Sequence, residues 1–296
     1  MFRALIVLVF LQTAFSSLAS HVMGGEITYK HIGNGNYQFE LVFYRDCNGA
    51  DVNAVSETLR VWNHPSLNAI PLLFVQRQDL SPSCTQVPGG AGPLLCGTGN
   101  NGGNGIGAIE KVIYRSAPIA LSGTPPAQGW AFTYENFSRS GALTNLSNPS
   151  TYGITLVAKI FNLSQPDDAP VFNEDPNFVS CAGLPYQYNA AVNDPNLDSL
   201  HFEFGVPYDH FPLGAYNPPS NPAPIPFNSN FSYLSPTPGP AINAGNVAAV
   251  LNPLNGNLTF NSFTIGNYAL KIVVKAYRSG MLISETEREI QLVLQP

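Results

Sequence analysis

Apolar and polar side chains alternate along much of the chain, and this two-residue period predicts β-strands. The clearest case lies between residues 36 and 45, where one face of an extended strand is wholly apolar. That face carries Tyr37, Phe39, Leu41 and Phe43, whereas Asn36, Gln38 and Glu40 lie on the opposite face. The preceding Gly33-Asn34-Gly35 suits a tight turn with positive φ angles, so residues 26–32 are expected to be the partner strand of a hairpin.

The same pattern continues to the C-terminus and predicts an all-β chain without amphipathic helices. A second hairpin is expected from residues 267–277 and 281–294, with its turn at Arg278-Ser279-Gly280. Shorter strands are expected at residues 58–62, 71–76, 109–120, 128–136, 151–161, 186–192 and 199–206. Two tandem antiparallel β-sandwich domains, immunoglobulin-like or cadherin-like, would bury the apolar faces of these strands.

Proline and glycine mark the expected boundaries. Residues 164–170 are polar and twice interrupted by proline near the middle of the chain, which indicates a linker. We therefore expect a first domain over residues 20–165, with a Gly-rich exposed loop at 88–107, and a second domain over residues 166–296. From about residue 207 to residue 240 proline recurs so often that regular strand pairing is not expected.

The chain begins with an apolar segment that is typical of a secretory signal peptide. Residues 2–18 carry one charge, at Arg3, and small residues precede the expected cleavage site after Ala19. Residues 1–19 would then be removed, and no transmembrane segment is expected in the mature chain. The sequence thus predicts a protein that is extracellular or on the outer cell surface.

Composition narrows the classes of partner. The chain has 13 Lys and Arg against 19 Asp and Glu, a formal net charge of −6, so nucleic acid is not an expected partner. Because 44% of the residues are hydrophobic and only 11% are charged, the composition excludes a disordered chain. A cell-surface or extracellular protein, or a glycan, is the expected partner.

Four cysteines in an exported chain favour two disulfides. Cys84 and Cys96 are close in sequence and bracket a loop rich in glycine and proline, so they are expected to pair. Cys47 and Cys181 would form the second pair. No Cys-x-x-Cys motif or Cys/His cluster at zinc-ligand spacing is present in the sequence.

Several motifs together resemble one family. They are SHVMGGEITY at residues 20–29, YRDCNG at 44–49, SRSGALTNL at 138–146, NDPNLDSL at 193–200, YRSG at 277–280 and REIQ at 288–291. The chain resembles the N-terminal region of large cell-surface proteins of Bacteroidota, which are associated with gliding motility and carry PKD-like or cadherin-like repeats. It departs from that family at Phe137-Ser138, where a cysteine is usual. The resemblance implies a protein of adhesion or gliding motility that has no catalytic residues.

The resemblance also implies a calcium site. Asp167 and Asp168 are similar to the linker of cadherin-like repeats, and Asp194, Asn196 and Asp198 are similar to the aspartate motif of the following repeat. Calcium takes six to eight oxygen ligands, and short acidic side chains on a turn supply several. The alternative is that Asp and Asn stand here because their side chains bond nearby backbone groups in turns. No other cofactor is expected.

Two further functions compete with adhesion. A carbohydrate-binding module would use exposed aromatic side chains, with Trp62 and Trp130 as candidates. A copper mono-oxygenase would need His21 at the mature N-terminus and a second imidazole from His64, His201 or His210. The carboxylates of Glu285, Glu287 and Glu289 alternate along one strand, and we expect them to form a solvated face opposite Lys271 and Lys275 rather than a catalytic pair.

Overall fold

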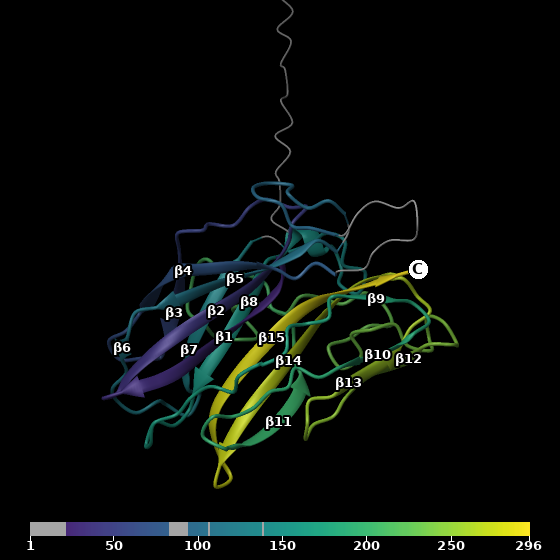
Figure 1. Cartoon of the computed structure of the whole chain (residues 1–296). Coiled ribbons are helices and arrows are strands. Elements are labelled where there is room, and N and C mark those ends of the chain that lie inside the picture. Colours follow the sequence, from purple (N-terminus) through teal and green to yellow (C-terminus); the bar gives the residue numbers. More distant parts are fainter. Residues whose placement is uncertain (1–21, 83–93, 106, 138) are drawn as a thin grey trace, which may run out of the picture.

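The computed structural model describes residues 22–82, 94–105, 107–137 and 139–296, and the regular elements within them are strands and one short 3-10 turn (Figure 1). The strands are β1 (Val22–Gly33), β2 (Asn36–Asp46), β3 (Ser56–Trp62), β4 (Ala69–Asp79), β5 (Ile109–Ser116), β6 (Ile119–Ala120), β7 (Trp130–Asn136), β8 (Ile154–Ile160), β9 (Val179–Cys181), β10 (Pro185–Tyr188), β11 (Ser199–Phe204), β12 (Val247–Leu251), β13 (Leu258–Asn261), β14 (Gly266–Arg278) and β15 (Met281–Gln295). The 3-10 turn spans Pro149–Thr151. The predicted all-β class is confirmed.

Both predicted hairpins are present. β1 pairs with β2 around a turn at Asn34 and Gly35, whose φ angles are 52° and 69°. β14 pairs with β15 around Ser279 and Gly280, whose φ angles are 52° and 79°. Positive φ values at these positions explain why the sequence places glycine, asparagine and serine there. The Pro-rich stretch 207–240 contains no strand, as expected.

Some predicted features lie outside the described residues. They are the signal peptide at residues 1–19, His21, Cys84 and part of the Gly-rich loop 88–107. Where the structure is described, it contains no helix with the length and apolar character needed to cross a membrane.

Eight strands form a closed circuit. The order is β1-β2-β5-β4-β3-β7-β8-β15, all neighbours are antiparallel, and β15 pairs back to β1. Seven of these strands contribute buried apolar side chains to one core, which includes Phe39 on β2, Leu72 on β4 and Phe132 on β7. The alternation seen in the sequence is therefore the alternation between the inner and outer faces of this circuit.

A second core lies on the outer face of β1, β2 and β15. There, β14 and β15 carry Leu270, Ile272 and Leu292 against Tyr186 and Phe260 of a small three-stranded sheet, β10-β13-β12. Figure 1 shows this small sheet beside the long yellow β14–β15 hairpin, which runs next to the purple β1. β1, β2 and β15 are consequently buried on both faces, as parts of two packed layers.

The division into two tandem sandwiches is not confirmed. β15 belongs to the second half of the chain, yet it pairs with β8 and β1 of the first half. The expected linker is also packed: Asp167 is fully buried, and the Ala169 amide donates to the carbonyl of Tyr29 at 2.9 Å. The two halves therefore share one sheet and meet through buried polar contacts.

Two glycines allow the circuit to close. Gly24 lies opposite Ile290, and a Cβ built on Gly24 would lie 1.8 Å from the carbonyl oxygen of Glu289. At Gly25, a Cβ would lie 2.5 Å from the carbonyl oxygen of Val42 on β2. Since no side chain fits at such distances, the Gly24-Gly25 pair is what lets β1 pass between β15 and β2.

Replacing Gly24 with alanine is expected to destabilise the protein severely. Gly24 and Gly33 both have positive φ angles, but a Cβ on Gly33 would meet no atom within 4 Å. Gly33→Ala is thus a matched control for backbone strain alone, which costs about 1 kcal/mol. We expect Gly24→Ala to lower the free energy of unfolding by about 3 kcal/mol more than Gly33→Ala in denaturant titrations. Equal losses would show that the β1–β15 contact is looser than described.

Candidate functional site

The disulfide joins Cys47 to Cys96, with 5.4 Å between their Cα atoms. The predicted pairs Cys84–Cys96 and Cys47–Cys181 are both wrong, because Cys96 is bonded to Cys47 and Cys181 is an exposed free thiol. The reason lies in the loop after β4. Its segment near Cys96 forms a bridge with Gly103, and the Gly103 amide donates to the Cys47 carbonyl at 2.8 Å. This brings Cys96 to the end of β2.

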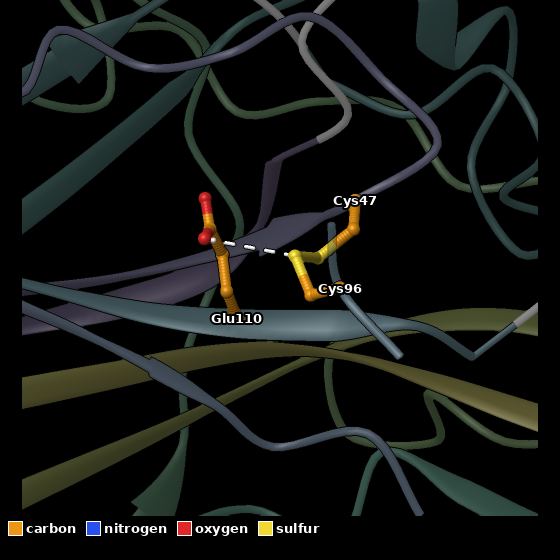
Figure 2. Close-up of side chains that lie close together, drawn as sticks. All are labelled: Cys47, Cys96 and Glu110. Atoms are coloured by element: carbon orange, nitrogen blue, oxygen red, sulfur yellow. Dashed lines mark hydrogen bonds between the residues drawn. A yellow bond between two sulfur atoms is a disulfide. The ribbon is translucent and has the colours of Figure 1, made fainter. Parts of the chain in front are cut away.

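A buried carboxylate, that of Glu110, lies beside the disulfide (Figure 2) and pairs with two arginines. Arg45 Nε donates to Glu110 Oε1 at 2.7 Å, and Arg77 Nη1 lies 3.4 Å from the same oxygen. Arg77 also pairs with Asp51 at 2.6 Å. Arg45 of the YRDCNG motif is fully buried, so its charge serves an internal ion pair and not the surface.

A second buried pair fixes the register between β1 and β15. Glu26 and Arg288 are direct cross-strand partners, and the Arg288 guanidinium donates from Nε and Nη2 to the two Glu26 oxygens at 2.9 and 2.6 Å. Arg288 Nη1 donates to Tyr188 Oη on β10 at 2.6 Å. The hydroxyl of Tyr44 donates to Glu26, and burial raises the pKa of Tyr44 well above its usual value. Four strands from two layers therefore meet at this pair.

The opposite face of β15 carries a buried row of charges. Glu285, Glu287 and Glu289 have at most 8% of their surface exposed, so the predicted solvated face is wrong. Their partners are Lys159 on β8, Lys271 on β14 and Arg139, respectively.

The row is covered by the Pro-rich segment. The Tyr208 ring centroid lies 5.3 Å from Lys271 Nζ, and the Thr155 hydroxyl donates to the Asp209 carbonyl. Burial raises the pKa of Glu287, and the nearby Lys271 ammonium opposes that shift. For Lys271, burial opposes the charged form, but Glu287 and Glu289 outweigh it and raise the pKa. The negative charges of the three carboxylates are thus balanced by three cations beneath the Pro-rich segment.

The five predicted calcium ligands lie at one junction. Asp167 accepts from Tyr29 Oη at 3.0 Å, and Asp168 accepts from the His31 amide at 2.6 Å. The Asp168 amide in turn donates to Asn196 Oδ1 at 2.6 Å. Asp194 Oδ1 accepts from the amides of Asn196 and Asp198 at 2.8 and 3.2 Å. The sequence motifs therefore identified residues that the fold brings together, from the 164–170 segment and the turn before β11.

An arginine side chain supplies positive charge at this junction. Arg278, at the tip of the β14–β15 hairpin, donates from Nε and Nη2 to the two oxygens of Asp198 at 2.7 Å and from Nη2 to Asp167 at 2.8 Å. Among the described residues, the junction offers no group of three acidic, His or Cys ligand atoms close enough to share a metal ion. In the described structure, Arg278 and backbone amides donate hydrogen bonds to these oxygens. Calcium binding by Asp167, Asp168, Asp194, Asn196 and Asp198 stays a prediction.

The turn at residues 194–198 includes an unfavourable backbone conformation. Leu197, which stands where the related motif more often has glycine, adopts a φ angle of 64° and is 91% exposed. A leucine in this left-handed region costs about 1 kcal/mol. Asp194 Oδ2 is buried without a hydrogen-bond partner. The Asx-type bonds of Asp194 hold the turn despite this strain.

The competing sites are not assembled in the described residues. Trp130 is fully buried, and the Arg60 guanidinium lies over the Trp62 ring, 4.3 Å from its centroid, which weakens a sugar-stacking platform built on these two rings. His64, His201 and His210 belong to no metal-binding group in that part of the chain. His210 instead contacts the Phe137 ring, and His64 contacts Trp130.

The junction carboxylates predict a pH-dependent stability. Burial, with smaller contributions from Asp194 and Asp198, raises the pKa of Asp167 to about 7 from an ordinary value of 3.8, although Tyr29 and Arg278 oppose the shift. Because the pKa of Asp167 is higher in the folded state, the folded protein binds this proton more tightly than the unfolded chain does. The resulting stabilisation is fully present below about pH 3.8 and is lost as the pH rises to about 7. In Asp167→Asn this dependence disappears.

We therefore expect the free energy of unfolding of the wild type, relative to Asp167→Asn, to fall by on the order of 3 kcal/mol between pH 4 and pH 8. Urea titrations across this range measure the difference. Parallel pH profiles for the two proteins would contradict the assignment. A dependence that changes when a chelator is added would instead assign the junction to calcium.

No family model, curated protein or solved structure matches this chain. Its function must accordingly be argued from the sequence motifs and from the positions that the fold gives to their residues.

Proposed function

We propose that this chain is a non-catalytic β-structured protein of the cell surface or extracellular space, of the Bacteroidota gliding and adhesion type. The observation that supports this proposal most is that charged residues of the sequence motifs form ion pairs with other parts of the chain. Glu26, Arg45 and Arg139, from three different motifs, form buried ion pairs, and Arg278 of a fourth motif forms a partly exposed one. Charged side chains paired in this way can hold strands in one arrangement, which supports a structural role.

The contact surface follows from the distribution of charge. No Asp, Glu, Lys or Arg occurs at residues 176–193 or 210–270. These two stretches contain all of the small sheet β10-β13-β12, together with residues 210–240 of the Pro-rich segment. A partner that contacts this side would not have to desolvate an ionised group.

Several apolar side chains on or beside this sheet are exposed to solvent in the described part of the chain. Val247 and Val250 on the edge strand β12 are 57% and 60% exposed. Leu184, beside β10, and Phe263, beside β13, are 60% and 54% exposed. Val247 is the cross-strand partner of Asn261 and Val250 that of Thr259, so the two valines lie on the same face of the sheet. Exposed apolar groups on a rigid sheet are typical of a protein–protein or protein–glycan contact surface.

Adhesion under flow tests this function. Beads coated with the protein are passed over films of cellulose, chitin and mucin, and the retained fraction is counted. We expect retention on at least one film and a decrease of about tenfold for Val247→Lys/Val250→Lys, because lysines at the centre of a contact surface must be desolvated. Leu73→Lys/Val75→Lys on β4 is the matched control, since these side chains are 62% and 42% exposed but lie away from the small sheet. Absence of retention on every film, or equal losses in the two variants, would contradict the proposal.

A further inference from the structure

Among the described residues, one oxygen of Glu110 has no hydrogen-bonding contact except the sulfur of Cys96. The residue is 4% exposed, and its Oε1 is held by Arg45 and Arg77. Its Oε2 points at Cys96 Sγ, 3.6 Å away (Figure 2). A disulfide sulfur carries no hydrogen, so this contact contains no proton while Cys47 and Cys96 are bonded. A buried carboxylate oxygen without a donor is unfavourable, because it has lost its hydrogen bonds to water without a replacement.

The dithiol form would give this oxygen a partner. A Cys96 thiol can donate a hydrogen to Oε2, and a metal ion can bind the oxygen and both sulfurs at once. The two sulfurs and the carboxylate oxygen lie within 4.8 Å of one another, which makes this the one such three-ligand group among the described residues. In a tetrahedral zinc site a sulfur ligand and an oxygen ligand stand about 3.5 Å apart. The observed sulfur–oxygen distance of 3.6 Å already matches that separation.

The surroundings suit thiolates. Arg45 Nη2 lies 4.0 Å from Cys96 Sγ, close enough to stabilise negative charge on that sulfur. Arg45 and Arg77 also orient the carboxylate through its other oxygen, as second partners of metal ligands commonly do. Cys47 is fully buried, whereas Cys96 is partly exposed and leaves one side open to water.

We propose that reduction of the Cys47–Cys96 disulfide creates a zinc site whose ligands are the two thiolates and Glu110 Oε2, with water as the fourth ligand. A phosphine or dithiol reductant supplies two electrons, and two protons from water complete the two thiols as the sulfur–sulfur bond breaks. Zinc then binds and the two thiols release those protons. The charges of the ion and the two thiolates cancel, and Glu110 remains paired with Arg45. This site is independent of the adhesive surface and makes metal binding depend on the redox state.

Cobalt(II) is a coloured probe for the test. The protein carries Cys84→Ser/Cys181→Ser, so that only Cys47 and Cys96 can supply sulfur, and it is reduced with a phosphine. We expect one equivalent of cobalt to produce a thiolate-to-metal charge-transfer band, and excess zinc to remove it. The oxidised protein should give no such band. Glu110→Gln should weaken binding by about 10-fold or more. Asp51→Asn is the control, because it disturbs the two arginines that pair with Glu110 without removing a ligand and should bind as the parent does.

Three outcomes would overturn the proposal. The first is a reduced parent that gives no charge-transfer band, whether folded or unfolded by circular dichroism. The second is a Glu110→Gln variant that binds cobalt as tightly as Asp51→Asn. The third is a Cys47→Ser/Cys96→Ser variant that keeps the band.

Discussion

The close crossing of β1 and β15 is the constraint on which the rest of the structure depends. β1 is the first described strand and β15 the last, and their pairing closes the eight-stranded circuit. Two features permit it: Gly24 removes the side chain that would collide with the Glu289 carbonyl, and Glu26 neutralises Arg288 where the strands meet. The closed circuit encloses one core, and its outer face supports the second core beneath the small sheet.

Buried or partly buried ion pairs join several segments that are distant in the described chain. Arg139 and Glu289, Lys159 and Glu285, and Arg278 with Asp198 each join parts of the chain that are far apart in sequence. Burying a charge pair costs desolvation energy that the attraction roughly offsets, so such pairs add little to net stability. A wrong register would leave several charges buried without partners, which is strongly unfavourable. We infer that these pairs select one arrangement of the strands.

Short sequence patterns predicted the two hairpins, but they did not predict contacts between segments that are far apart in the chain. The hairpins β1–β2 and β14–β15 could be predicted because alternation and a Gly-containing turn lie within one stretch of sequence. The pairing of β15 with β1 could not, since no periodicity reveals which strand a distant one joins. For the same reason Glu285, Glu287 and Glu289 resembled a solvated face: their cations come from β8, from β14 and from Arg139. The Cys47–Cys96 bond forms because a glycine-rich loop folds back toward β2. The closeness of Cys84 and Cys96 in the sequence gave no indication of that fold. The junction around Asp167 was located correctly, but the arginine that neutralises it lies on another hairpin.

A double-mutant cycle on Glu26 and Arg288 tests the central claim most directly. Arg288→Met alone leaves Glu26 buried without a cation and should lower the free energy of unfolding by about 3–5 kcal/mol. Glu26→Leu alone leaves Arg288 unpaired and should cost a similar amount. If charge pairing at the β1–β15 crossing sets the register, the double variant Glu26→Leu/Arg288→Met should recover to within about 2 kcal/mol of the wild type. A double variant whose loss equals the sum of the two single losses would contradict the account.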